Sequence, residues 1–572
     1  MKKNKIITLV ILSIFTITLT SAHPSYSFTR IVDLLFDGTP VKPEDLDTIL
    51  QTIKKNKAKN KTNKNPKKAK PDKFVIVKAK QKDPRNIQLE VDTSEVLVKK
   101  EGDIQAPITN TGFLNAITDA INLWDNVEVA DVGFAPLKFA SGKANPGDGR
   151  NVISFRTIKD IEGIANGAPV VSIITYARNE TIQFMNKLIM VKPGTILDAD
   201  IIFDPTNNPC LALHTTTGET KIGGDETVIS EGGVDSNANL SACESVFSGD
   251  ITDLAVRTIA NLLGLESSAN SSSATSAVAQ IMTRYALTID DEIGLANLYP
   301  KKKAISNHGI IIGTVKLNKT PIRGAHVVLE DTTTGEPIAS AISDINGKFI
   351  ISVVPVGTYT VYVEPVDGPI RRNGLSMNFF GLTAQLIFTT NVFPSPLKII
   401  KNRVTKIDFE VKELSASAFN INHLTVNLNE KDADDSGGSF LLPIRIMPGE
   451  TLTDVQFWGS NISSDFGTLS ISGPGLTVTN VMDASIPISP FVKCEACTET
   501  PEIMCKRDPM CADTEEVTEE PDQIRGITAD ISCNDDIKPG PRNIIFTGNM
   551  VDPLHPSFGL RDQITGGIIV TE

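Results

Sequence analysis

The stretch ITDLAVRTIANLLG, residues 251–264, decides how the first half of this chain is interpreted. Its apolar residues recur at helical spacing, and Gly264 suits the left-handed residue that ends a helix. Ser248 or Asp250 can accept the free N–H groups of the first turn. We therefore predict a helix in which Arg257 and Asn261, four residues apart, share one face.

The segments around this helix predict a domain built on a sheet. Upstream, FLNAITDAINLWDNVEV (113–129) has a helical apolar period that ends near Trp124, and residues 151–155, 169–176 and 188–192 have strand composition. DADIIFDP (198–205) follows as a further strand. Downstream, Met282 precedes LTIDDEIGLANLYP (287–300), whose residues 290–298 predict a second helix.

In this order the segments resemble the catalytic domain of matrixin-type metzincin proteases. The signature of that family is H-E-x-x-H-x-x-G-x-x-H, which supplies the zinc ligands and a general base. With the family glycine placed on Gly264, Arg257, Thr258, Asn261 and Ser267 stand where the signature has His, Glu, His and His. Met282 then resembles the methionine of the metzincin turn. The resemblance implies a metzincin-like domain that has lost its catalytic residues.

No replacement for the zinc ligands is evident. Arg257 stays protonated and would repel a metal ion, and Thr258 cannot act as a base. Between residues 109 and 300 the only histidine is His214. We expect no zinc, no other cofactor and no catalytic residue. Arg257 is then either a solvent-exposed side chain, which we favour, or a partner of Asp198, Asp200, Glu266 or an acidic ligand.

Three carboxylates are candidate ligands of a calcium ion. Asp198, Asp200 and Asp204 are the hard oxygen ligands that Ca²⁺ takes, although such residues also cap strands and turns.

The N-terminus has the features of a secretory signal. Residues 1–22 combine the basic MKKNK, an apolar run and the small residues of TSA, whereas a membrane anchor would need a longer run. Residues 23–105 predict a pro-region or spacer. Its segment 54–73 holds ten lysines and one acidic residue, which is typical of a solvated linker, or else contacts an acidic partner. No later run is long enough to span a membrane, so we expect a bacterial exported protein in the periplasm, at the cell surface or outside the cell.

The seven cysteines suit an oxidising compartment. We predict a Cys210–Cys243 disulfide. Five cysteines remain: Cys494, Cys497, Cys505, Cys511 and Cys533. They allow two disulfides and one free thiol, and their spacing does not decide which of them pair.

The second half of the chain has the pattern of an all-β protein. Over residues 313–365 the motifs G-x-V, P-x-x-G-A-x-V, D-x-x-G-x-F and P-x-G-x-Y-x-V stand in order, and VTKIDFEV (404–411) predicts a closing strand. These motifs resemble the carboxypeptidase regulatory-like domain, a transthyretin-like β-sandwich. Residues 413–572 resemble a bacterial Ig-like module that carries a cysteine-rich acidic insertion.

The sequence thus predicts a multidomain protein: an α+β metzincin-like domain (106–300), a regulatory-like β-sandwich (305–412) and an Ig-like β domain (413–572). We expect a non-catalytic pseudoprotease that binds a protein or glycan at the cell envelope. The alternatives are an active zinc metalloendopeptidase of matrixin type and a purely structural cell-surface protein. The net charge of −13, which becomes more negative without the lysine block, disfavours a nucleic-acid partner.

Overall fold

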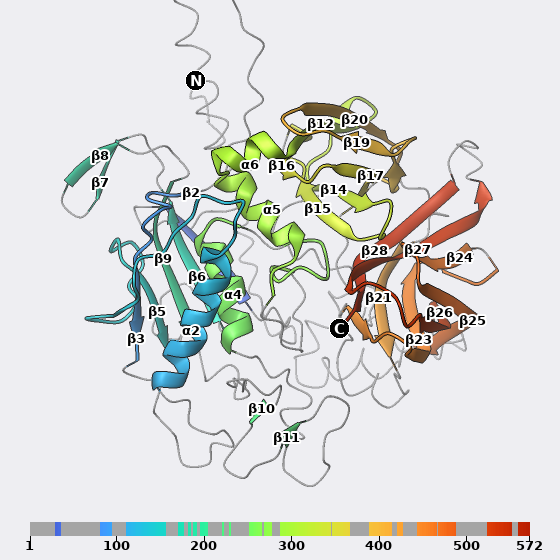
Figure 1. The fold of residues 1–572 in the computed structure, drawn as a ribbon, viewed down its shortest axis with the longest axis horizontal. Helices are drawn as coiled ribbons and strands as arrows, with labels where there is room; N and C mark the ends of the chain where they lie inside the picture. Colours follow the sequence, from blue (N-terminus) through green and yellow to red (C-terminus); the bar gives the residue numbers. More distant parts are fainter. Residues whose placement is uncertain are drawn as a thin grey trace, which may run out of the picture.

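A computed structural model provides the structure of this protein (Figure 1). It describes residues 29–35, 80–93, 110–155, 170–176, 181–184, 187–190, 195–203, 220–221, 228–229, 251–265, 268–276, 286–344, 346–365, 388–413, 420–426, 443–460, 462–465, 467–487, 523–551 and 559–571.

The first unit is a seven-stranded sheet in the order β1-β6-β9-β5-β3-β4, with β2 paired to β9. The β6–β9 pair is antiparallel, and the other pairs are parallel. Two helices pack beside this sheet, α2 (Asn110–Asp125) and α4 (Ile251–Leu262) (Figure 1). The strands are β1 (Thr29–Leu35), β2 (Lys80–Gln81), β3 (Leu89–Asp92), β4 (Lys138–Phe139), β5 (Asn151–Phe155), β6 (Val170–Tyr176) and β9 (Thr195–Phe203).

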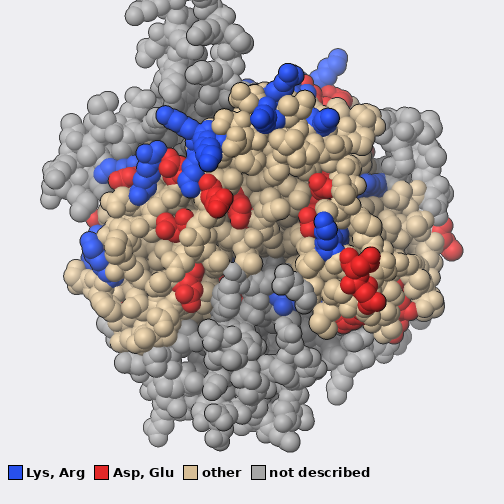
Figure 2. All heavy atoms as spheres, viewed as in Figure 1, with Lys and Arg blue, Asp and Glu red and all other residues tan. Residues whose placement is uncertain are grey.

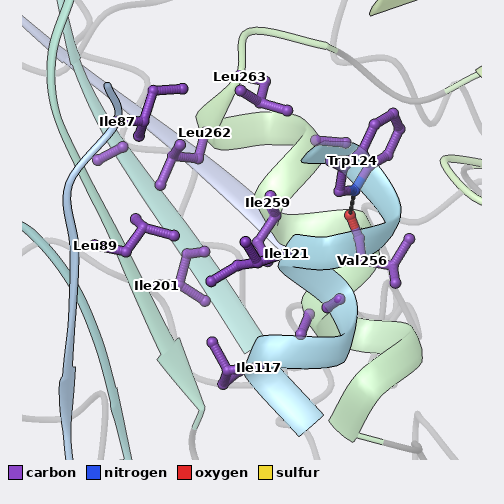
Figure 3. Close-up of a cluster of buried hydrophobic side chains, with 14 of the residues drawn as sticks. Ile87, Leu89, Ile117, Ile121, Trp124, Ile201, Val256, Ile259, Leu262 and Leu263 are labelled. Atoms are coloured by element: carbon purple, nitrogen blue, oxygen red, sulfur yellow. Dashed lines mark hydrogen bonds between the residues drawn. The ribbon is translucent and has the colours of Figure 1, made fainter. Parts of the chain in front are cut away.

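Apolar packing between the helices and the sheet holds the first unit together. Figure 3 shows Trp124 of α2 beside α4, where its indole Nε1 donates a hydrogen bond of 2.8 Å to the carbonyl of Val256. Trp124 and the neighbouring Ile259 are fully buried, and Ile121 is buried. On the sheet side, the rings of Phe113, Phe155 and Phe203 meet edge to face or stacked. Burial of an indole this large is a major contribution to the stability of the unit.

Helix α5 (Ile289–Leu298) joins the first unit to the second. Its start is fixed by a capping box between Thr288 and Asp291, which satisfies two N–H groups of the first turn. Leu295 packs into the core of the first unit, whereas Ile293 packs into the core of the second. The short helix α6 (Lys302–Asn307) follows and leads into the second unit.

The second unit is all-β, with two sheets around one apolar core. One sheet has the order β13-β12-β16 with β20 parallel to β12, and the other has β15-β14-β17-β18 with β19 paired to β17. The strands are β12 (Gly309–Leu317), β13 (Thr320–Pro321), β14 (Ala325–Asp331), β15 (Pro337–Ile342), β16 (Lys348–Val354), β17 (Gly357–Pro365), β18 (Asn391–Val392), β19 (Leu397–Ile399) and β20 (Val404–Val411).

The third unit is also all-β, with the sheets β21-β23-β26-β25 and β22-β28-β27-β24 around a third core. The strands are β21 (Asn420–Val426), β22 (Ile444–Ile446), β23 (Thr451–Ser460), β24 (Gly467–Ile471), β25 (Leu476–Pro487), β26 (Gln523–Cys533), β27 (Gly540–Val551) and β28 (Gly559–Val570). Two small hairpins complete the described strands: β7 (Thr181–Phe184) with β8 (Lys187–Met190), and β10 (Thr220–Lys221) with β11 (Val228–Ile229).

Several predicted elements are confirmed. The helix that contains Trp124 buries the apolar residues that its period selects, and the predicted helix at 251–264 is α4, with Gly264 left-handed at a φ of 90° after its end. The two all-β units are likewise present. The predicted signal and the lysine block at 54–73 lie outside the described residues.

Candidate functional site

Helix α4 does not line an open groove. Arg257, Thr258 and Asn261 are all buried, and only Asp253 of this helix is half-exposed. The Thr258 hydroxyl donates 2.8 Å to the carbonyl of Leu254, one turn earlier on the same helix. Ser267 and Met282 lie outside the described residues. The residues at the degenerate signature positions are therefore parts of a packed interior.

Arg257 corrects one expectation directly. Its side chain is buried, so the prediction of a solvent-exposed guanidinium is wrong. Burial lowers the pKa of Arg257 to about 10, and the negative charges of Asp253 and Asp291 oppose that shift. Asp253 lies on α4 itself and Asp291 on α5, so acidic groups of both helices act on Arg257.

Asp198 and Asp200 hold a turn beside the sheet. The carboxylate of Asp198 accepts the N–H groups of Gly147 (2.8 Å) and Gly149 (2.9 Å), and Asp200 accepts that of Val152 (3.0 Å). Burial raises the pKa of Asp198 to about 7, against the opposing effect of these backbone hydrogen bonds. Among the described residues there is no cluster of three metal-ligating side chains. Asp204 lies outside that part, so the calcium site stays a prediction.

The cysteines are mostly beyond the described residues. This applies to the predicted Cys210–Cys243 pair and to four of the five C-terminal cysteines. Cys533, at the end of β26, is a buried free thiol, and burial raises its pKa.

The most developed polar site in the described chain was not predicted from the sequence. It lies where β14 and β17 of the second unit meet β27 and β28 of the third. We call it the polar junction and define it by His326, Glu330, Tyr362, Glu364, Asn543, Arg561, Gln563 and Thr565.

Glu364 stands at the centre of the polar junction. Its carboxylate accepts hydrogen bonds from the Thr565 hydroxyl (2.8 Å) and the Gln563 amide (2.9 Å), both on β28. From its own unit it meets the Nδ1 atom of His326 at 2.7 Å. All four side chains are buried. Because a buried carboxylate without partners is costly, these bonds tie the third unit to the second.

Asn543 makes the second set of bonds across the polar junction. Its amide nitrogen donates to Glu330 (2.6 Å) and to the Tyr362 hydroxyl (3.1 Å), while its carbonyl oxygen accepts the Gly566 N–H (2.9 Å). Both N–H groups and the carbonyl oxygen of this side-chain amide therefore have a hydrogen-bond partner. Tyr362 in turn meets the Thr565 hydroxyl at 2.9 Å.

Arg561 brings a positive charge to the polar junction. Arg561 lies 3.8 Å from Glu330 and places its guanidinium 5.5 Å from the centre of the Tyr362 ring. Burial nevertheless raises the pKa of Glu330, since desolvation outweighs the attraction of Arg561 and the bond from Asn543. Burial also raises the pKa of Tyr362 well above its usual value.

Two glycine turns bring the backbones of the two units into direct contact next to the polar junction. Gly335 and Gly473 have φ angles of 75° and 77°, and a Cβ on Gly335 would stand 2.2 Å from the Gly473 nitrogen. The Ser472 hydroxyl donates 2.5 Å to the Gly335 carbonyl. Only glycine combines this conformation with so close an approach.

A serine-rich loop of the first unit, residues 268–276, contacts the polar junction at Thr565. Asp291 of α5 accepts the Ser273 hydroxyl (2.5 Å) and the Ala274 N–H (3.0 Å), which fixes the loop. Ser271 then donates its N–H to the carbonyl of Thr565 at 2.9 Å. All three units therefore meet at β28.

Only one sequence signal could have indicated this site. Glu330 and Glu364 stand near the ends of the otherwise apolar strand segments AHVVLED and VYVEP, whereas β28 around Gln563 is polar and carries no such signal. A charged residue inside an otherwise apolar strand needs a buried partner. The identity of that partner, about 200 residues away in the chain, does not follow from local pattern.

Comparison with known proteins yields little. No family model matches the chain, and no curated protein matches it. Among solved structures, the major pilin SpaD from Corynebacterium diphtheriae is 10% identical with a TM-score of 0.14, over 45% of this chain and 64% of the pilin. The pilin BcpA from Bacillus cereus has a TM-score of 0.13 over 46% and 70%, again at 10% identity. A putative carbohydrate-binding protein from Bacteroides uniformis, also 10% identical, has a TM-score of 0.13 over 45% and 95%.

The predicted resemblance to matrixin-type metzincins is wrong. No family model matches, and the described chain is mostly β with four helices. The prediction of an α+β metzincin domain is therefore wrong as well, and so is the assignment of the second unit to the carboxypeptidase regulatory-like family. The prediction of two all-β units is confirmed. TM-scores this low assign neither a family nor a function. No helix in the described chain is both long and apolar enough to cross a bilayer.

Proposed function

We propose that this chain is a non-catalytic protein of the cell envelope, whose three units form one rigid body that presents a surface to a partner. The observation that carries the proposal is the polar junction. Its carboxylates, amides and hydroxyls are buried and bonded to one another across the unit boundary, so they are used to fix geometry.

The chemistry of the polar junction also favours a structural role over a catalytic one. Glu364 and His326 form a pair of a kind that can activate a nucleophile, and Thr565 lies against Glu364. A catalytic group must also reach its substrate, however, and these side chains are 1–7% exposed at most. The predicted export signal at residues 1–22 supports placement at the envelope.

Asn543→Ala tests the rigid coupling. The variant leaves Glu330 and Tyr362 without a donor, so we expect the free energy of unfolding to fall by about 1–3 kcal/mol. In calorimetry the second and third units should unfold in one transition in the wild type and separate in the variant. Thr333→Ala, at an exposed site in the β14–β15 turn, is the matched control and should change neither.

Cell fractionation completes the test. The proposal expects the protein in the envelope or outside the cell. Separate unfolding of the two units in the wild type, retention in the cytoplasm, or hydrolysis of a peptide library by the purified protein would each contradict it.

A further inference from the structure

One end of the second unit carries exposed aliphatic and basic side chains together. The β16–β17 turn contributes Val356, and the turn from β19 to β20 contributes Ile400, Lys401, Arg403 and Val404. Lys398 lies on β19, just before that turn. We call these six residues the basic tip: Val356, Lys398, Ile400, Lys401, Arg403 and Val404.

Strand pairing brings these residues to one place. Gly357 faces Ile399 in the β17–β19 pair, so Val356 and Ile400 are neighbours at the end of that pair. The other side of the turn is fixed by hydrogen bonds from the Asn402 N–H to His308 (2.8 Å) and from the Ile310 N–H to Arg403 (2.9 Å). The tip is therefore a preformed surface.

The aliphatic side chains of the basic tip point into solvent. Val356 and Val404 are each 59% exposed and Ile400 is 43% exposed, in a unit whose other aliphatic residues fill a core. Single exposed aliphatics are ordinary on a protein surface. Three at one end of the unit, on two turns and the first residue of β20, indicate a surface that contacts something apolar.

The charge of the tip is of one sign. Lys398, Lys401 and Arg403 are exposed, and none of them forms an ion pair with a described residue. The sequence has no Asp or Glu in 301–309, 354–358 or 398–406, the segments that meet at this end. Lys302 and Lys303 of α6 add two exposed cations on the flank. Figure 2 shows several lysine and arginine side chains along the upper edge, over α6 and the adjacent strands of the second unit, with acidic side chains farther along the same edge.

We infer that the basic tip docks on a lipid bilayer that contains anionic headgroups. Such a surface attracts cations, and exposed aliphatic side chains insert at the boundary of headgroup and acyl chain. An anionic polysaccharide would satisfy the cations and leave Val356, Ile400 and Val404 in water. The inference rests on the proposed envelope function only in that the protein must reach a membrane.

Vesicle sedimentation with the full chain tests this inference. We expect binding to phosphatidylglycerol–phosphatidylcholine vesicles, weaker binding at high salt, and little binding to phosphatidylcholine alone. Lys401→Gln with Arg403→Gln should weaken binding about 30-fold, since each cation near an anionic surface contributes about fivefold. Lys138→Gln with Lys319→Gln is the matched control, because it removes the same charge from exposed sites outside the tip.

A second variant separates a bilayer from a soluble polyanion. Val356→Thr with Val404→Thr keeps side-chain shape and should weaken vesicle binding several-fold, with no effect on retention by a heparin column. Equal binding to neutral and anionic vesicles, or a charge effect without any effect of the threonine pair, would overturn the inference. Both outcomes leave the calorimetric and fractionation tests of the envelope function unaffected.

Discussion

The interior around Trp124 and the polar junction differ in the kind of interaction that holds neighbouring parts of this protein together. In the first unit, α2, α4 and the sheet meet through apolar side chains, with one indole hydrogen bond to Val256. Between the second and third units, buried carboxylates, amides and hydroxyls meet instead. Apolar packing tolerates small shifts and changes of shape, whereas hydrogen bonds to a buried carboxylate need defined positions.

This difference shows how stability and orientation are divided in the molecule. The apolar interior contributes most of the free energy of folding of its unit, because it removes large side chains from water. The polar junction contributes less net energy, since its groups give up hydrogen bonds to water, but it accepts one arrangement of the two units.

Trp124→Ala should have the largest effect. It removes a fully buried indole and its hydrogen bond, so we expect the free energy of unfolding of the first unit to fall by about 3–5 kcal/mol. Urea denaturation followed by circular dichroism measures this. Phe139→Ala removes an aromatic side chain that is 67% exposed and should change stability by less than about 0.5 kcal/mol. A small loss at Trp124 would mean that the apolar interior is not the main source of stability.

A pair of glycine variants tests how closely the second and third units fit. Gly147 and Gly335 are both left-handed, with φ angles of 81° and 75°, but a Cβ meets nothing within 4 Å at Gly147 and the Gly473 backbone at Gly335. Gly147→Ala should cost only the conformational penalty of about 1–2 kcal/mol. Gly335→Ala should cost about 1–3 kcal/mol more, because the two backbones must separate. Equal losses in the two variants, measured by thermal unfolding, would show that the contact is loose.

The first unit should also show a pH slope in its stability. The pKa of Asp198 is raised to about 7 by burial, above the usual value of about 3.9 in an unfolded chain. Between these values the folded state holds a proton that the unfolded state has released. Stability should therefore fall as the pH rises from about 4 to about 7, by up to about 1.4 kcal/mol per pH unit.

Asp198→Asn should flatten that slope when the free energy of unfolding is measured at several pH values. Asp83→Asn, at an exposed position, should leave it unchanged. An unchanged slope in the Asp198 variant would assign the pH dependence to other groups.

The elements of the fold could be predicted where local pattern decides them. The helical period around Trp124 and the strand at 404–411 follow from the spacing of apolar residues, and the structure has both. The family assignment failed because it rested on the order of such elements and on one glycine. Both are weak signals of family membership, and no independent observation supported them. The burial of Arg257 was missed because a charged residue on a helix is normally exposed, and tertiary packing overrode that expectation.

The polar junction could not be predicted because its partners are distant in the chain. Glu364 and Gln563 are separated by 199 residues, and Glu330 and Asn543 by 213. No periodicity links such positions, so only the folded arrangement of the two units shows that they meet.

These separations also set an order in time. During synthesis, the strands that carry Glu330 and Glu364 are complete long before β28 leaves the ribosome. Glu330 waits for Asn543 of β27, and Glu364 waits for Gln563 and Thr565 of β28, so the face that the two carboxylates occupy must stay hydrated until then. A chain interrupted anywhere before β28 would keep that face open to water. The polar junction therefore closes only after β28 has been synthesised, so its closure reports that the second and third units have docked.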